Sequence, residues 1–123
     1  MASEITLTAS LSYYKSTVMA SAVARALSNV TFNQTGSGYI EGTLSVTTSA
    51  IAIPLGGVTA PHWAFFYNLD ATNFIRIMNG SGGAKVPKLR AGECAFFPWD
   101  DTATPYAQAD TSPCLMEYLI IQL

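Results

Sequence analysis

The segment from Gly56 to Ile77 restricts the possible folds more than any other part of the sequence. Two runs of aromatic and apolar residues flank a polar centre, residues 68–73, whose sequence is Asn-Leu-Asp-Ala-Thr-Asn. Asn, Asp and Thr side chains hydrogen-bond their own nearby backbone and favour turns. We therefore predict a β-hairpin here, with residues 68–73 reversing the chain and both strands contributing to the hydrophobic core.

Short strands are also predicted along most of the remaining chain. Residues 4–11 alternate apolar side chains with Thr and Ser, the pattern of a half-buried strand. Clusters of turn residues, such as 33–38 and 79–83, separate further segments of the same kind. These segments are residues 30–32, 39–40, 44–46, 50–55, 94–97, 106–109 and 114–121. Pro98 ends the segment 94–97, because proline cannot donate to a ladder.

Residues 16–28 fit two structures. Val18, Met19, Ala22 and other apolar residues share one helical face, and Ser16 suits a helix N-cap, so the pattern alone favours a helix. A strand over the same residues gives a less regular alternation. With at most this one short helix among many short strands, the sequence predicts an all-β fold. We expect a single β-sandwich or jelly-roll-like domain over residues 1–123.

The composition indicates an assembly subunit. Half of the 123 residues are hydrophobic and 11% are charged, against roughly 25% in ordinary soluble domains. The abundant neutral polar residues Ser, Thr, Asn and Gln explain part of this deficit, and burial of surface in subunit contacts would explain the rest, so we expect a homo-oligomer. The formal net charge of −2 argues against a nucleic-acid partner. Lys85, Lys88 and Arg90 form a small basic cluster, which we interpret as part of a solvated loop.

No membrane partner is expected either, because no run of about 18 apolar residues occurs. The first residues lack the basic and apolar regions of a signal peptide, so we expect synthesis in a cytoplasm.

Candidate catalytic and metal-binding patterns are weak. His62 is the single histidine, and any zinc site or catalytic triad would depend on it alone, so a structural role is expected. The glycines at 80, 82 and 83 lack the Lys-Ser/Thr of a phosphate loop and predict a hairpin tip. Asp100 and Asp101 lack the alternation of a calcium loop. Glu93 and Asp100 could act as a glycosidase pair only if they faced each other across a cleft. We predict no catalytic residue, cofactor or metal, and hence no enzyme.

The two cysteines, Cys94 and Cys114, lie in predicted strands, where we expect them to pack as small hydrophobic side chains. A disulfide between them would require adjacent strands.

Glu117 is the most unusual residue, because it interrupts an otherwise apolar strand that is typical of a central or covered position. Its carboxylate must be exposed, paired or hydrogen-bonded. Arg76 is the natural partner, in an ion pair across a subunit interface; alternatively, Glu117 faces solvent at a sheet edge. Aromatic residues near loops, Trp63, Tyr67 and Trp99, are further interface candidates, and each suits the core equally well.

An ordered set of residues resembles small virion structural proteins of tailed bacteriophages. The set begins with Gly57-Val58, Pro61 and Trp63–Phe66, continues through 68–75, 88–89 and 91–93, and ends with 106–107, Ala109, Leu115 and 117–120. The resemblance, which spans roughly residues 56–121, implies a β-sandwich that decorates or cements the head shell, or that belongs to the tail or fibres. It also implies that residues 18–32 are extended.

From this resemblance we expect a homotrimer in the virion, bound to the major capsid protein or to other virion proteins. A carbohydrate-binding module of a tail or fibre is the alternative. That alternative requires a row of exposed aromatic side chains on one sheet face.

Overall fold

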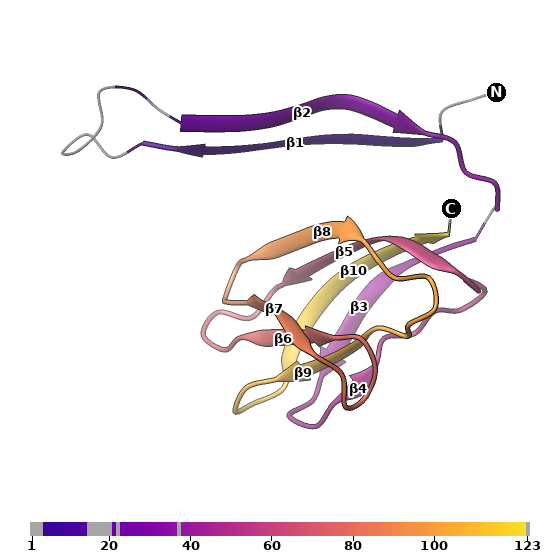
Figure 1. Cartoon of the computed structure of the whole chain (residues 1–123). Coiled ribbons are helices and arrows are strands. Elements are labelled where there is room, and N and C mark those ends of the chain that lie inside the picture. Colours follow the sequence, from indigo (N-terminus) through magenta and orange to yellow (C-terminus); the bar gives the residue numbers. More distant parts are fainter. Residues whose placement is uncertain (1–3, 15–20, 22, 37, 123) are drawn as a thin grey trace. The chain divides into compact units, whose positions relative to one another are not determined.

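In the computed structural model, residues 4–14, 21, 23–36 and 38–122 are described, and within them the chain forms ten strands and no helix (Figure 1). Two compact units are present, residues 1–35 and residues 36–123. The strands are β1 (Ile5–Tyr13), β2 (Val23–Phe32), β3 (Tyr39–Val46), β4 (Ile51–Ala52), β5 (Pro61–Asn68), β6 (Ile75–Met78), β7 (Lys85–Leu89), β8 (Cys94–Pro98), β9 (Tyr106–Ala109) and β10 (Cys114–Gln122).

The first unit is an antiparallel hairpin of β1 and β2, which pair with each other. The register shifts between Leu7 and Ala9, opposite Asn29, which adopts a positive φ of 54°. Asparagine tolerates this conformation, and an exchange of hydrogen bonds with Thr8 supports it. The predicted strand over residues 4–11 is confirmed. Residues 23–28 are extended, as the resemblance implied and against the helical pattern; residues 16–20 and 22 lie outside the described residues.

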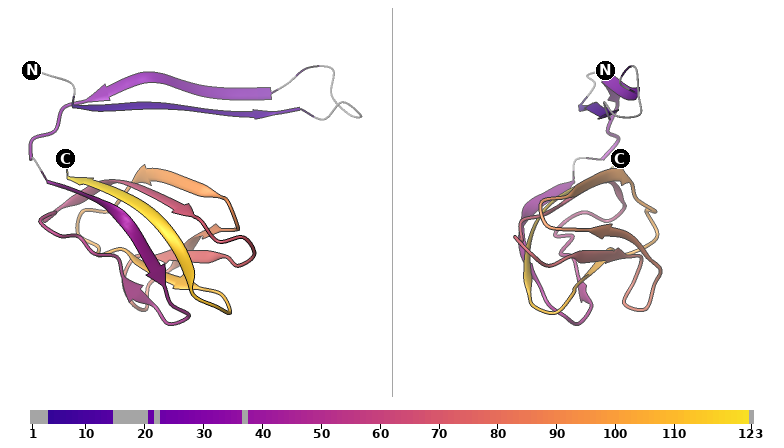
Figure 2. Two further views of the ribbon diagram at one scale, coloured as in Figure 1. Left: turned by 180° about the vertical axis from the view of Figure 1, so that it is seen from behind. Right: turned by 90° about the vertical axis from the view of Figure 1, so that its left-hand side faces the viewer.

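The second unit is a β-sandwich. One antiparallel sheet has the order β3-β10-β5-β8 and the other the order β4-β9-β6-β7. Alternate residues of the strands enter the core between the sheets, where Phe66 contacts Phe97 and Trp99 at ring-centroid distances of 6.1 and 6.2 Å. Figure 2 shows this unit from two further directions. The all-β sandwich prediction is confirmed, although its strands lie within residues 36–123 instead of spanning the whole chain, since β1 and β2 form a sheet of their own.

The predicted hairpin at residues 56–77 is wrong in its pairing. Both strands exist as β5 and β6, but they belong to different sheets, and the segment between them crosses from one sheet to the other. The turn chemistry is present: Asp70 Oδ1 accepts hydrogen bonds from the backbone N–H groups of Thr72 and Asn73. A connection of six residues can span the ~10 Å between packed sheets, so the turn residues alone did not determine the partner of each strand.

Buried Asn68 fixes this crossing. Its Nδ2 donates to the carbonyl oxygens of Asn73, at 2.8 Å, and Leu89, at 3.0 Å, while its Oδ1 accepts from the N–H of Asp70 at 2.9 Å. The side chain is fully buried. One amide therefore ties the end of β5 to the start of β6 and to the end of β7.

Residues 85–89 form a strand where a loop was predicted. This strand, β7, is at the edge of its sheet, so it needs ladder hydrogen bonds on one side alone and tolerates Pro87. The glycine-rich segment before it is the tip of the β6–β7 hairpin, as predicted. β10 lies between β3 and β5, which confirms the central position predicted for residues 114–121 (Figure 1).

Candidate binding surfaces

The sheet β3-β10-β5-β8 turns an apolar surface away from the core. In β10 the buried side chains Cys114, Met116, Tyr118 and Ile120 alternate with outward-facing ones. The register places these outward side chains beside those of β3, β5 and β8. We call this surface the outer face; its apolar members are Tyr39, Trp63, Phe65, Tyr67, Phe96, Leu115, Leu119 and Ile121. Tyr39 is 64% exposed, Leu115 48% and Phe96 40%.

The charges on the outer face are all negative. Glu117 in β10 lies opposite Thr43 in β3, and Glu41 lies diagonally beside it, opposite Leu119. Both glutamates are exposed and help to line a shallow hollow of about 520 Å³, together with Phe65 and Leu119. The four strands contain no lysine or arginine. The outer face is therefore an apolar surface with two carboxylates and no cation.

Three of the five predicted interface residues come together here. Trp63 lies opposite Ile121, and Tyr67 lies opposite Glu117. Both aromatic side chains are half-buried. Glu117 faces solvent, which agrees with the second of the two alternatives given for it. Its strand, β10, lies in the middle of the sheet and not at an edge.

Arg76 lies in the other sheet, in β6, so it does not pair with Glu117 within one copy of the chain. Its guanidinium carbon is 5.1 Å from the centre of the Phe74 ring, and Lys88 Nζ is 4.0 Å from the same centre. Lys88 lies directly opposite Arg76 in β7. Cation–π contacts to one ring thus hold two positive charges on the outward side of this sheet.

Trp99 lies in the core and not at an interface, the two roles that were predicted for it. It is 8% exposed, and its Nε1 donates a 2.6 Å hydrogen bond to the carbonyl oxygen of Ala103. Its ring also contacts Phe97, at a centroid distance of 5.8 Å. Trp99 anchors the segment after β8 to the core and lines a neighbouring pocket. It is therefore not part of an exposed contact surface.

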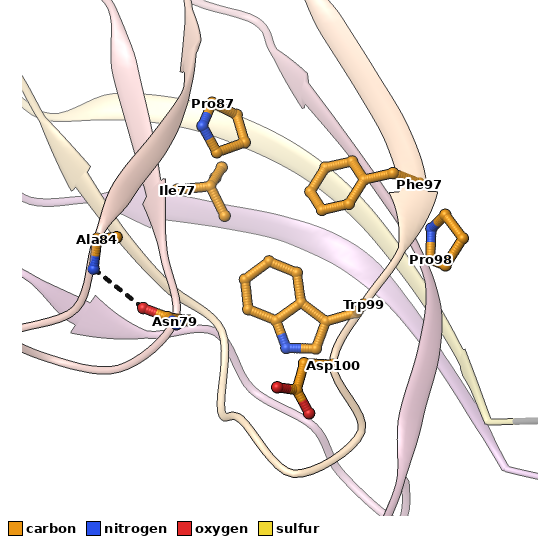
Figure 3. Close-up of a pocket in the computed structure, with 8 residues that line it drawn as sticks. All are labelled: Ile77, Asn79, Ala84, Pro87, Phe97, Pro98, Trp99 and Asp100. Carbon is orange, nitrogen blue, oxygen red and sulfur yellow. Dashed lines mark hydrogen bonds between the residues drawn. The ribbon is translucent and has the colours of Figure 1, made fainter.

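That pocket, of about 410 Å³, opens between the β6–β7 hairpin and the end of β8 (Figure 3). β7 and β8 are edges of their sheets and lie in contact at this side of the sandwich. The lining is mostly apolar and comprises Ile77, Asn79, Ala84, Pro87, Phe97, Pro98, Trp99 and Asp100. Sequence reasoning did not predict that these segments meet. The available signal was the pair Pro87 and Pro98, because proline favours edge strands.

The polar groups at this pocket are engaged in local structure. Asn79 Oδ1 accepts a 3.0 Å hydrogen bond from the N–H of Ala84. Asp100 Oδ1 accepts from the hydroxyl and the N–H of Thr102, at 2.7 and 2.9 Å, and these bonds lower the pKa of its carboxyl group. Both side chains stabilise turns, and Asp100 therefore serves the structure of its own loop.

The other candidate chemical groups are separated. Glu93 precedes β8 and Asp100 follows it, so the two carboxylates stand at opposite ends of a strand of five residues, some 20 Å apart at ~3.3 Å per residue. A glycosidase pair requires ~5–9.5 Å. His62 is the second residue of β5, and its carbonyl oxygen accepts a hydrogen bond from the backbone N–H of Trp99. Among the described residues, no group of three or more His, Cys, Asp or Glu side chains is placed to hold a metal ion.

Both cysteines are free. Cys114 is buried, as expected, whereas Cys94 is exposed at the outer face, opposite Tyr67, against the prediction. β8 and β10 are separated by β5, so the two thiols are not on adjacent strands.

No helix in the described part of the chain is long and apolar enough to cross a membrane. Comparisons with protein-family models, with curated proteins and with solved structures find no match for this chain.

Proposed function

We propose that this chain is a non-enzymatic structural subunit of a phage virion, which binds the head shell as a decoration or cement protein and acts as an oligomer, a trimer by expectation. The observation that carries the proposal is the outer face. Monomeric proteins rarely leave a continuous apolar surface of this kind in water, and such patches mark interaction sites. The resemblance of residues 56–121 to virion proteins supplies the kind of partner.

Binding would follow from burial of this face. Four strands at ~4.8 Å spacing and eight residues at ~3.3 Å give a surface of about 19 by 26 Å, or ~500 Å². At ~25 cal/mol per Å² of apolar surface, complete burial gives at most about 12 kcal/mol, because the face also carries polar side chains, and association costs of ~4–15 kcal/mol offset most of it. A single copy would therefore bind weakly. An oligomer that presents several such faces to a repeating shell would bind far more tightly, because the later contacts form within one complex.

Co-sedimentation with purified heads of the encoding phage tests this proposal. The wild-type chain should sediment with expanded heads in a fixed ratio and raise the temperature at which they rupture. Leu115→Asp places a charge on the outer face and should abolish binding. Ala52→Asp, which adds the same charge on an exposed site of the other sheet, is the control and should bind normally. No sedimentation with heads, or equal binding by both variants, would refute the proposal.

A carbohydrate-binding module is the second candidate, because the outer face carries the row of aromatic side chains that this function requires. Tyr39 and Phe96 lie on the two edge strands, with Trp63 and Phe65 between them. Aromatic rings of this kind can stack on sugar rings. Binding of bacterial surface polysaccharide that is lost in Trp63→Ala, without sedimentation with heads, would favour this candidate over the first.

A further inference from the structure

The β1–β2 hairpin also carries an apolar face. Along β1, Leu7, Ala9, Leu11 and Tyr13 alternate with Thr and Ser side chains. Across the ladder, Val30 lies opposite Leu7, Leu27 opposite Ala9, and Arg25 opposite Leu11. Leu11 is 77% exposed, Tyr13 56% and Leu27 52%. One positive charge therefore stands within an exposed apolar surface.

A two-stranded sheet of this kind is marginally stable in water and needs a further layer or strand. Natural edge strands are usually protected by lysines, prolines or inward charges. β1 and β2 contain no proline, and Arg25 is their single charged residue. The hairpin is thus suited to a contact that covers its apolar face.

The charges on the two apolar faces indicate which surface covers the hairpin. Two outer faces packed together would bring four carboxylates into one interface without a cation, and burial of unpaired charges is costly. Two hairpin faces would likewise bring two Arg25 side chains together. A hairpin on an outer face pairs one guanidinium with Glu41 and Glu117, while the remaining contacts are apolar on both sides.

We propose that the hairpin of one copy lies on the outer face of a second copy, with Arg25 in the hollow beside Glu41 and Glu117. The inference rests on the proposed function in one respect, the expectation of a homo-oligomer. Each copy donates one hairpin and accepts one, so the contacts close into a ring when the rotation between copies permits.

The dimensions agree with this arrangement. Two strands of nine and ten residues give a face of about 10 by 30 Å, or ~300 Å². This area fits on the ~500 Å² of the outer face and leaves ~200 Å² of it open for contact with the head shell. One contact given and one received bury ~600 Å² per copy, which approaches the ~800 Å² per partner of stable interfaces.

Reversal of the charge at Arg25 on the hairpin, or at Glu117 on the outer face, tests the proposal. Analytical ultracentrifugation of the full chain over a concentration series should show a reversible oligomer for the wild type. Arg25→Glu and Glu117→Arg should each weaken association at least tenfold. An equimolar mixture of the two variants should associate more tightly than either alone, because each residue at position 25 then meets a residue of opposite charge at position 117. In a mixed ring of two copies, both hairpin contacts regain a pair of opposite charges. In a mixed ring of three copies, two of the three hairpin contacts do.

Three control variants make the result specific. Lys85→Glu and Asp101→Arg introduce the same charge changes at exposed sites away from both faces and should associate as the wild type does. Arg76→Glu removes the cation of the alternative contact, between the outer face and the second sheet of another copy. If Arg76→Glu weakens association and Arg25→Glu does not, the hairpin is not the occupant and the proposal is refuted.

Folding of the whole chain is checked by far-UV circular dichroism, because Trp63 and Trp99 both lie in the sandwich and do not report on the hairpin. If Arg25→Glu fails to fold, Leu11→Ser replaces it, with the same expected loss. A wild-type chain that stays monomeric, or a mixture no tighter than its components, would overturn the inference. The proposed function fails separately, in the sedimentation assay with heads: self-association by this route without binding to heads would refute the virion role and leave the hairpin contact standing.

Discussion

Replacement of Asn68 by alanine should destabilise the sandwich more than any exposed substitution of the same type. The side chain is fully buried and holds three backbone groups: the carbonyl oxygens of Asn73 and Leu89, and the N–H of Asp70. In Asn68→Ala these groups lose their partner, and the two sheets lose the amide that links β5, β6 and β7.

The magnitude follows from the burial of each group. A buried polar group left without a partner costs about 1–3 kcal/mol. The Leu89 carbonyl belongs to a buried hydrogen bond and the other two groups to partly buried ones, so a total of about 3–4 kcal/mol is expected. A domain of roughly 90 residues has a free energy of unfolding of about 4–13 kcal/mol. At ~4–8 °C per kcal/mol, Tm should fall by about 12–30 °C.

Urea denaturation followed by tryptophan fluorescence measures this change, because both tryptophans lie in the sandwich. Asn79→Ala is the matched control. It removes one exposed hydrogen bond, from Ala84 N–H to Asn79 Oδ1, and should cost about 0.5–1.5 kcal/mol. Equal losses in the two variants would refute the assignment of Asn68 as the residue that fixes the crossing between sheets.

Three further predictions concern single residues. Hydrogen bonds from the backbone N–H of Asn73, and to a lesser extent of Thr72, lower the pKa of Asp70 below the ordinary 3.8. The charged form of Asp70 therefore stabilises the fold above pH ~4, and this stabilisation is lost as the pH falls further. Asp70→Asn should accordingly show a smaller decrease in Tm between pH 7 and pH 2.5 than the wild type. One thiol, Cys94, should react rapidly with Ellman's reagent in the native chain and both in urea, because burial shields Cys114 and raises the pKa of its thiol; two rapid native reactions would contradict the structure. Trp99→Phe should cost about 1–2 kcal/mol by loss of the hydrogen bond to Ala103, and Trp99→Ala about 3–5 kcal/mol by the added cavity, as measured by thermal melting.

Local patterns in the sequence predicted most strands, because alternation and turn residues act over short distances. Residues 5–11, 94–97 and 114–121 lie in strands as expected. Pairing depends on contacts between distant segments, and there the prediction failed. β5 and β6 look like a hairpin in the sequence, yet β5 pairs with β8 and β10 in one sheet, and β6 pairs with β7 and β9 in the other. The residue that fixes the crossing, Asn68, was recognised as a turn former, but its burial could not be seen from its neighbours in sequence.

The candidate surface was predictable in part. Glu117 stood out because it interrupts an apolar strand, and Trp63 and Tyr67 were chosen as aromatic residues near loops. Their common location required the register of β5 against β10. Glu41 was missed, since a carboxylate in a strand rich in polar residues is ordinary until β3 is placed beside β10. The separation of residues 1–35 from the sandwich was missed for a similar reason: a hairpin strand and a sandwich strand have the same alternation.

Cys94 provides the most direct test that the outer face is the contact surface of the assembled protein, because its exposed thiol lies on that face opposite Tyr67. The measurement compares the rate of Cys94 alkylation in dilute free protein with the rate in protein bound to phage heads, with the site identified by mass spectrometry. We expect alkylation to slow at least tenfold in the bound state. An unchanged rate in protein that is demonstrably bound would contradict the account and place the contact elsewhere on the chain.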